Sequence, residues 1–186
     1  GYRVQFNNAI GPYKGGLRFH PSVNLSTFKF LGFEQIFKNS LTTLPMGGAK
    51  SVIMLPSKDH PRTEAEARAM GRFVDTFGGA YIAAEDVGVD TQFVDWMASE
   101  TTHVMGGETV SRGGDPSPWT AMGTFHGMRA CLIHSGRGDD FSGVTVAVQG
   151  VGHVGQNLCK LLTDAGANVL VADIDKECVD HIVDTC

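Results

Sequence analysis

The stretch VTVAVQGVGHVG, residues 144–155, joins a short apolar segment to three glycines with the spacing Gly-x-Gly-x-x-Gly. The apolar segment predicts a buried strand. Apolar residues at helical spacing follow, and Gly166 is placed to end that helix. A second apolar segment, residues 168–172, predicts another strand, which runs into Asp173. This order predicts a βαβ unit of an α/β protein. The inward face of its helix is expected to contain Val154, Leu158 and Leu161.

The same unit predicts a dinucleotide site. Gly-x-Gly-x-x-Gly alone is a weak signal, but the preceding strand and an acid 18 residues after Gly155 make the match specific. The glycines allow a tight turn, approach of a pyrophosphate and helix–strand packing, and the helix N-terminus offers N–H donors. Asp173 would bind both adenine-ribose hydroxyls and repel a 2′-phosphate, which favours NAD over NADP. We expect His153 to face solvent. The expected cofactor-binding residues here are Gly150, Gly152, His153, Val154, Gly155 and Asp173.

A second glycine-rich stretch, LPMGGAK at residues 44–50, leads into one lysine and the apolar run 52–55. The run predicts a buried strand with Lys50 at its edge, and the glycines allow close approach to the backbone. A lysine held partly out of water has a lowered pKa and can act as a base or a polarising group. A surface lysine after a tight turn is an equally good interpretation of this segment alone.

The residues before this lysine predict a helix over residues 26–41, with Ser26 as its N-cap. Gln35 and Lys38, three residues apart, share one face of it. An ordinary surface pair between Lys38 and Glu34 is the alternative explanation of Lys38. The apolar residues at helical spacing are residues 30, 33, 37 and 41.

The start of the chain predicts a strand and a loop. Apolar and polar residues alternate at residues 2–8, which indicates a half-buried strand. The following GPYKGG, residues 11–16, is predicted to be a loop without regular structure. Residue 1 is not methionine and lies beside this strand-like run, and residues 176–186 resemble a helix that has just begun. We therefore expect the chain to be an internal part of a longer protein.

Beyond residue 60, Thr63 and Glu66 predict a capping box that begins a helix, which Gly78-Gly79 ends. A short strand at residues 81–84 then runs into Asp86. A carboxylate at the carboxyl end of a strand is a common catalytic position in α/β proteins. A turn or N-cap aspartate is an equally good interpretation of the residues alone.

Residues 111–118 are rich in glycine and proline and form a candidate interdomain hinge. Ser117 and Pro118 are expected to cap a helix that continues to about His134. Its predicted buried face consists of Ala121, Phe125, Met128 and Leu132.

The composition excludes several classes of protein. The 186 residues are 42% hydrophobic and 19% charged, as in globular proteins of one or two domains. The net charge of −5 argues against nucleic acid as a partner. No apolar run reaches the length of a membrane span, so we expect no membrane partner. The four cysteines form no CxxC pair, which indicates reduced thiols and a cytoplasmic protein, and the histidines lack metal-ligand spacing, so we expect no metal site.

Taken together, the lysines, Asp86 and GVGHVG resemble the Glu/Leu/Phe/Val amino-acid dehydrogenases over essentially the whole chain. Residues 1–50, with AIGPYKGGLRFHPSVN and LPMGGAK, resemble glutamate dehydrogenases more closely. Residues 51–186, with YIAAEDVGVDT, GGDPSPWTAMG and VTVAVQGVGHVGQNLCKLL, are more similar to leucine or phenylalanine dehydrogenases.

The resemblance implies the roles of the central residues. Lys50 corresponds to the lysine that polarises the attacking water and the carbinolamine. Asp86 corresponds to the residue that exchanges protons with the substrate nitrogen. Lys38, helped by Gln35, corresponds to the group that holds the α-carboxylate.

Further residues are implied at the periphery of the site. Lys14 matches the lysine that binds the side-chain carboxylate of glutamate, whereas leucine-type relatives carry an apolar residue there. Gly15 and Gly16 would line the pocket with backbone, and Thr120 would lie near the nicotinamide amide. Asp115 departs from the asparagine that leucine-type relatives usually carry in this turn.

The implied fold is α/β with two domains. Residues 1–112 would form a mixed-sheet, substrate-binding and catalytic domain that lacks its N-terminal part. Residues 113–186 would form the first half of a Rossmann NAD-binding domain, truncated in this chain. The implied partners are an amino acid (glutamate favoured; leucine, valine or phenylalanine as alternatives), its 2-oxo acid and ammonia, with a homo-oligomer of hexamer or octamer type. A different NAD dehydrogenase or imine reductase, and a nucleotide-binding relative or fragment without catalysis, are the other hypotheses.

Overall fold

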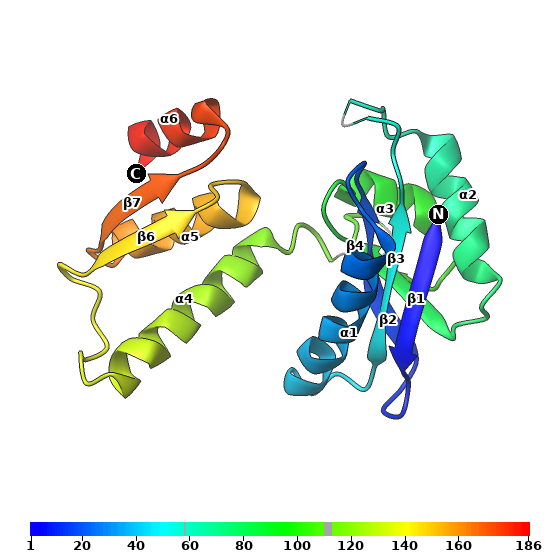
Figure 1. Cartoon of the computed structure of the whole chain (residues 1–186), viewed down its shortest axis with the longest axis horizontal. Coiled ribbons are helices and arrows are strands. Elements are labelled where there is room, and N and C mark those ends of the chain that lie inside the picture. The colour runs from blue at the N-terminus through cyan, green and yellow to red at the C-terminus, as the bar shows by residue number, and fades with distance from the viewer. Residues whose placement is uncertain (58, 110–112) are drawn as a thin grey trace. The chain divides into compact units, whose positions relative to one another are not determined.

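The computed structural model describes residues 1–57, 59–109 and 113–186. These form two compact units, Gly1–Asp115 and Pro116–Cys186, and each contains its own sheet (Figure 1). The candidate hinge at residues 111–118 begins with two residues that lie outside the described part of the chain.

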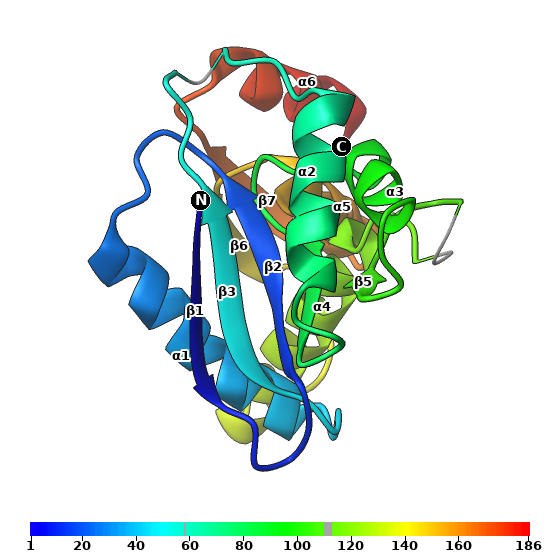
Figure 2. The same cartoon turned by 90° about the vertical axis from the view of Figure 1, so that its right-hand side faces the viewer.

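The first unit is a mixed sheet covered on both sides by helices. Its strand order is β1-β3-β2-β4-β5, with β1 antiparallel to β3 and the other pairs parallel. Helix α1 lies on one side of the sheet, and α2 and α3 lie on the other (Figure 2). The elements are β1 (Tyr2–Asn7), β2 (Tyr13–Phe19), α1 (Leu25–Leu41), β3 (Gly47–Ile53), α2 (Glu64–Asp75), β4 (Tyr81–Glu85), α3 (Thr91–Ala98) and β5 (Val104–Met105).

Successive side chains along the strands point to opposite faces of the sheet, one toward α2 and α3 and the other toward α1. Ala49 belongs to the main hydrophobic cluster, which β2, β3 and β4 share with α2 and α3. Val52 instead packs with Phe28 of α1 in a smaller cluster. Because successive side chains point to opposite faces, Lys50 shares the face of Val52, on the side of α1.

The expectation of a loop at residues 11–16 is wrong, because Lys14, Gly15 and Gly16 lie inside β2, the middle strand of the sheet. Gly15 is required by a close approach of backbones: a Cβ added to it would lie 1.6 Å from the carbonyl oxygen of Ala49. Glycine in a strand can mark such an approach instead of a turn.

The boundaries of α1 and β3 also differ from the expectation. Asn24, not Ser26, is the N-cap of α1, and its Oδ1 accepts a hydrogen bond from the Thr27 N–H at 3.0 Å. Strand β3 begins at Gly47 instead of residue 52, so Lys50 lies in its interior and not at an edge. Gly48 belongs to this strand because helix α1 packs closely against it: a Cβ on Gly48 would lie 2.6 Å from the backbone nitrogen of Ile36.

The apolar residues that predicted α1 lie on its exposed side. Phe30, Phe33, Phe37 and Leu41 are open to solvent, whereas the buried residues are Phe28, Gly32, Gln35 and Asn39. The helical period therefore predicts the helix but not its buried face, which combines one large aromatic residue with a glycine and two amides.

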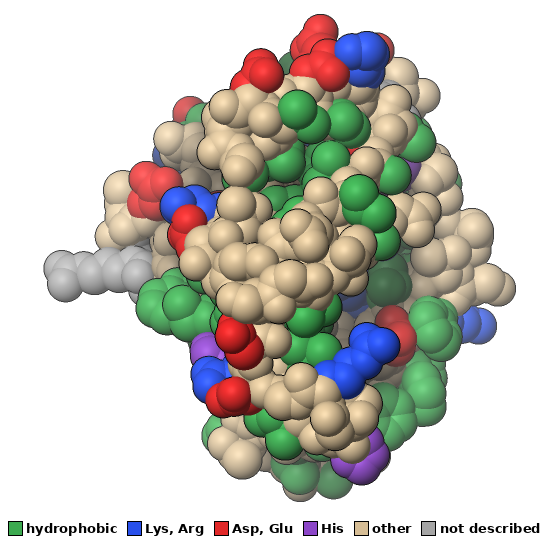
Figure 3. Space-filling view, turned by 90° about the vertical axis from the view of Figure 1, so that its left-hand side faces the viewer, with side chains coloured by type: hydrophobic (Ala, Val, Ile, Leu, Met, Phe, Trp, Pro, Cys, Tyr) green, Lys and Arg blue, Asp and Glu red, His purple; other side chains and the backbone are tan. Residues whose placement is uncertain are grey.

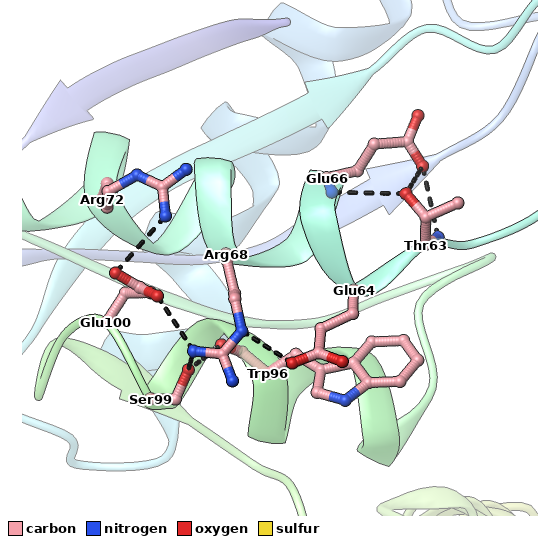
Figure 4. Close-up of polar contacts among 8 residues, drawn as sticks. All are labelled: Thr63, Glu64, Glu66, Arg68, Arg72, Trp96, Ser99 and Glu100. Carbon is pink, nitrogen blue, oxygen red and sulfur yellow. Dashed lines mark hydrogen bonds and ion pairs between the residues drawn. The ribbon is translucent and has the colours of Figure 1, made fainter.

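A polar cluster joins α2 to the end of α3 (Figure 4). The predicted capping box of Thr63 and Glu66 is confirmed at the start of α2. Arg68 donates hydrogen bonds to Glu64 at 2.7 Å, to Glu100 at 3.0 Å and to the Ser99 hydroxyl at 2.7 Å. Exposed pairs of this kind contribute little stability each.

The second unit contains the predicted βαβ unit. Strands β6 and β7 are parallel, and β7 has the predicted bounds. Helix α4 has Pro116, not Ser117, as its N-cap. Leu158 and Leu162 are buried on α5, while Val154 and Leu161 pack at the margin of the same cluster. The elements are α4 (Ser117–His134), β6 (Thr145–Gln149), α5 (His153–Asp164), β7 (Asn168–Ala172) and α6 (Lys176–Thr185).

The surface of this unit retains open apolar side chains. Trp119, Leu170 and Ile174 are exposed. Figure 3 shows hydrophobic side chains in green at the surface among acidic ones in red. Among the described residues, no helix is both long and apolar enough to cross a membrane.

Candidate active site

Three adjacent strands bring Lys50, Asp86 and Arg18 together. Lys50 lies in β3, Arg18 in the neighbouring β2, and Asp86 directly follows β4 on the other side of β2. The Lys50 ammonium lies 3.2 Å from Asp86 Oδ2, and Arg18 Nε donates to the same oxygen at 2.8 Å. Lys50 is only 6% exposed, so the surface-lysine interpretation is wrong. The structure thus joins the two predicted catalytic residues in one partly buried ion pair.

The surroundings lower the pKa of both groups. Burial is the main cause of the lowered pKa of Lys50; the charges of Arg18 and Lys38 act in the same direction, and Asp86 opposes them. Burial alone would raise the pKa of Asp86, but hydrogen bonds and charges from Arg18 and Lys50 lower it below its ordinary value. Asp86 is therefore ionised at neutral pH, and Lys50 loses its proton more readily than a surface lysine does.

Lys14 and Lys38 extend this positive region. Burial lowers the pKa of Lys14, and the charges of Lys38 and Lys50 add to the effect. Lys38 is exposed on α1, and no ion pair joins it to Glu34 within the described residues. An anion placed among the three ammonium groups would relieve their mutual repulsion.

Gln35 is held away from solvent by its own helix. Its Nε2 donates to Asn39 Oδ1 at 2.9 Å, and Asn39 Nδ2 donates to the Gly47 carbonyl at 2.7 Å. This chain ties α1 to the start of β3. The amide group of Gln35 is thus engaged within the protein, whereas Lys38 is exposed on the same helix.

A buried hydroxyl pair supports the glycines of β2. Tyr81 is fully buried, and its hydroxyl donates to the Gly15 carbonyl at 2.9 Å. It also meets the Ser51 hydroxyl at 2.6 Å. Burial raises the pKa of Tyr81, so its hydroxyl remains a neutral donor. Gly15 is therefore fixed by a contact from β4.

Glu85 lies beside the site on the other face of β4. Burial raises its pKa to about 7, with help from the charges of Asp115 and Asp90. Its Oε2 is buried and has no hydrogen-bond partner among the described residues. Asp115, the residue that departs from the asparagine of leucine-type relatives, is thus placed near Glu85.

In the second unit, the glycine loop is tightly packed at one glycine and open at another. Gly150 has a φ of +93°, and a Cβ on Gly155 would lie 2.0 Å from the Gly150 carbonyl oxygen. A Cβ on Gly152, the N-cap of α5, would meet nothing within 4 Å, which leaves room for a ligand. Pockets that bind small molecules usually have volumes of about 300–1,000 Å³. The cavity here measures about 540 Å³ and is lined by Gln149, Gly150, Ala172, Asp173 and Ile174.

The acid of this unit faces the glycine loop. Asp173 Oδ2 accepts a hydrogen bond from the Val151 N–H at 2.7 Å, and Oδ1 accepts one from the Asp175 N–H at 2.9 Å. His153 is exposed, and Val154 packs toward the core, so Val154 can offer only its backbone to a ligand. Thr120 is exposed on α4, with its hydroxyl donating to the Pro116 carbonyl at 2.9 Å.

Sequence reasoning missed Arg18, Tyr81 and Ser51, as well as α3 and β5. Arg18 follows Lys14 by four residues in the same stretch. A strand assignment there would have given the two side chains the same parity and so the same face. In the described part of the chain, no group of three or more His, Cys, Asp or Glu residues could hold a metal ion.

Two family models match the chain. Residues 1–103 match the Glu/Leu/Phe/Val dehydrogenase dimerisation domain, and residues 115–179 match the Glutamate/Leucine/Phenylalanine/Valine dehydrogenase domain. These matches together extend over both units.

Individual proteins agree with the family models. The NAD-specific glutamate dehydrogenase of Porphyromonas gingivalis is 41% identical over 91% of this chain and 41% of its own length. The leucine dehydrogenase of Thermoactinomyces intermedius is 40% identical over 94% of this chain and 49% of its own length. NADP-specific glutamate dehydrogenases are similar to the same degree. The chain thus spans about half the length of these relatives or less.

Solved structures give the same result. The hetero-hexameric glutamate dehydrogenase of Thermus thermophilus, in its Leu-bound form, matches 93% of this chain and 45% of its own, with a TM-score of 0.78 and 27% identity. The two-domain α/β fold expected from the sequence is confirmed by this likeness, and so is the resemblance itself. The chain belongs to the Glu/Leu/Phe/Val dehydrogenase family.

Proposed function

We propose that the protein containing this chain catalyses the reversible oxidative deamination of an L-amino acid to its 2-oxo acid and ammonia, with NAD as the hydride acceptor. The observation that carries the proposal is the partly buried ion pair of Lys50 and Asp86, 3.2 Å apart. The charges of Lys38 and Lys50 lower the pKa of Lys14, and the charge of Lys38 also lowers the pKa of Lys50. The three ammonium groups therefore lie close together.

The side chains suit the proton transfers of this reaction. Lys50, whose pKa is lowered, can take a proton from the attacking water and return it. Asp86 stays ionised and can accept protons from the substrate nitrogen. The exposed ammonium of Lys38 is available to the α-carboxylate, and holding that group aligns the Cα–H bond for reaction.

Glutamate is the substrate that we favour, and Lys14 supports it. Its ammonium is half-buried among cations, and no ion pair of the described residues involves it. A γ-carboxylate would supply the missing partner, whereas a leucine side chain would leave a desolvated charge unpaired. Leucine is the second candidate, because a leucine dehydrogenase is 40% identical to this chain.

NAD is the cofactor that we favour over NADP. The glycine loop and the start of α5 would hold the pyrophosphate, since the cavity at this loop is open and Gly152 leaves it unobstructed. Asp173 lines that cavity with a carboxylate whose pKa is lowered by backbone N–H groups. A fixed negative charge there would repel a 2′-phosphate.

A second copy of the chain is the proposed partner of the exposed side of α1. Phe30, Phe33 and Phe37 are 58%, 44% and 51% exposed, and single monomers rarely leave such a stripe open. The matching family model is described as a dimerisation domain. We therefore propose a homo-oligomer.

A panel of amino acids with NAD, assayed on the full-length enzyme, tests the reaction. We expect glutamate-dependent NADH formation that falls by about 10²-fold or more in kcat in Lys50→Ala and in Asp86→Asn, the usual scale for general acid–base groups. Lys160→Ala and Asp164→Asn, from an exposed i,i+4 pair on α5, are matched controls and should retain turnover.

The alternatives give different results in the same assay. NAD binding without turnover of any amino acid would indicate a nucleotide-binding relative. Turnover at the wild-type rate in either site variant, with cofactor binding intact, would remove that residue from its proposed role.

A further inference from the structure

One oxygen of Asp86 is shared by two cations. Arg18 Nε lies 2.8 Å from Oδ2, and Lys50 Nζ lies 3.2 Å from the same atom. Arg18 also reaches Oδ1 through Nη2 at 3.5 Å. Arg18 therefore contacts both oxygens of the carboxylate and fixes its plane, whereas Lys50 contacts only one.

The two cations differ in whether they can lose their charge. An arginine guanidinium stays charged at all ordinary pH values, whereas a buried lysine can become neutral. When Lys50 gives up its proton, the charge–charge attraction between Lys50 and Asp86 is lost, but the ion pair of Arg18 and Asp86 remains. Side-chain exposures of 22% for Arg18 and 17% for Asp86 leave this pair only partly screened by water.

The other groups near the pair do not replace Arg18. The charge of Lys38 on α1 lowers the pKa of Lys50, but no ion pair joins Lys38 to Asp86 among the described residues. The pKa of Lys14 on β2 is lowered by the charges of Lys38 and Lys50. Glu85, the last residue of β4, precedes Asp86, and the charges of Asp115 and Asp90 raise its pKa. Once Lys50 is neutral, Arg18 is the remaining cation in contact with Asp86 among the described residues.

We propose that Arg18 is a positioning residue that keeps the Asp86 carboxylate ionised and oriented while Lys50 changes its protonation state. The inference rests on the proposed function, because it concerns the same proton transfers. Arg18 also places a permanent positive charge beside Lys50, which favours the neutral, basic form of that lysine. A single side chain on β2 thus supports both partners.

The test compares Arg18→Gln, Arg18→Lys and a control in the full-length enzyme. The control is Arg3→Gln, since Arg3 lies on β1 and stacks 3.9 Å from the centre of the Phe77 ring. The readout is kcat against pH for oxidative deamination. Loss of the Arg18 charge should raise the pKa of both Asp86 and Lys50, so the rising limb should move to higher pH by about one unit, a tenfold change in ionisation ratio.

A merely structural role predicts a different profile. If Arg18 were only structural, its loss would lower kcat at every pH or lower the melting temperature. The rising limb of the pH profile of kcat would stay in place, as we expect for Arg3→Gln. A folded Arg18→Gln enzyme with an unmoved limb overturns the proposal. Absence of turnover in the wild type overturns the proposed function instead, before any variant is compared.

Arg18→Lys decides the question if Arg18→Gln fails to fold. Its charge should keep the limb near the wild-type position, while kcat should fall about tenfold because one ammonium does not span both carboxylate oxygens as the guanidinium does. Wild-type kcat together with a wild-type limb in Arg18→Lys would overturn the proposed positioning role.

Discussion

Tyr81→Phe removes one hydroxyl from the centre of the first unit. That hydroxyl donates to the Gly15 carbonyl at 2.9 Å and lies 2.6 Å from the Ser51 hydroxyl. Since a tyrosine has one hydroxyl hydrogen, Ser51 must be the donor in the second bond. Phenylalanine keeps the ring and its packing, so the change isolates these two hydrogen bonds.

The magnitude follows from burial. Tyr81 and Ser51 are both 0% exposed, and Gly15 is buried, so water does not replace the lost partner. A buried polar group left without a partner costs about 1–3 kcal/mol. We expect Tyr81→Phe to lower the free energy of unfolding by about 2 kcal/mol. Ser51→Ala leaves the bond to Gly15 in place and should cost about 1 kcal/mol.

Urea unfolding of the two single variants and the double variant measures these values. The double variant no longer contains the orphaned Ser51 hydroxyl, so its loss of stability should be smaller than the sum of the single losses by about 1 kcal/mol. Tyr2→Phe, which changes a tyrosine exposed on β1, is the control and should alter stability by less than about 0.5 kcal/mol.

The same variant tests the link to the site. Gly15 lies next to Lys14 in β2, so freeing its carbonyl should raise KM for the amino acid more than it lowers kcat. A Tyr81→Phe protein as stable as the wild type, or strictly additive losses in the double variant, would refute the assignment of these hydrogen bonds.

The remaining predictions concern four residues. Lys14→Leu should shift the ratio of kcat/KM for glutamate over leucine toward leucine by about tenfold or more, and an unchanged ratio would exclude Lys14 from side-chain recognition. Asp173→Ser combined with a nearby arginine should move preference from NAD toward NADP, measured as the ratio of kcat/KM values. Thr63→Ala should cost about 1 kcal/mol in urea unfolding, because the capping box is lost. The lowered pKa of Asp86 means that its stabilising contribution is present above its unfolded pKa and is lost as pH falls through its folded pKa. Wild type should therefore lose more stability than Asp86→Asn between about pH 5 and about pH 3.

The second unit could be predicted closely because its signals are local. An apolar strand, a glycine loop, a helix and a strand ending in Asp173 follow one another within about thirty residues, the usual length of such a unit. The strand at residues 168–172 was predicted with the bounds that the structure shows. The hydrogen bond from Val151 to Asp173 had no signal in the sequence, because it depends on how the loop closes.

The first unit could be predicted only in part, since its key residues obey non-local constraints. Gly15 was interpreted as part of a loop, whereas the carbonyl of Ala49, on another strand, is what requires glycine there. The sequence predicts Lys50 and Asp86 as site residues from their positions in the chain. It does not predict the contact of Arg18 with Asp86, because that contact depends on strand β2 lying between β3 and β4. Periodicity predicts α1 but not its buried face, where Phe28 is accompanied by Gly32, Gln35 and Asn39 instead of further apolar residues.

The hydrogen bond between Asp173 and the Val151 N–H also limits how cofactor preference can evolve. The same carboxylate that would discriminate against a 2′-phosphate also fastens the first turn of the glycine loop at 2.7 Å. A neutral residue at this position would lose both the hydrogen bond that holds the loop and the proposed selectivity against NADP. Affinity for either dinucleotide should therefore fall before further substitutions restore it. A change of preference from NAD to NADP would therefore pass through an enzyme that binds both cofactors weakly, unless another substitution first supplies a new hydrogen bond to the loop.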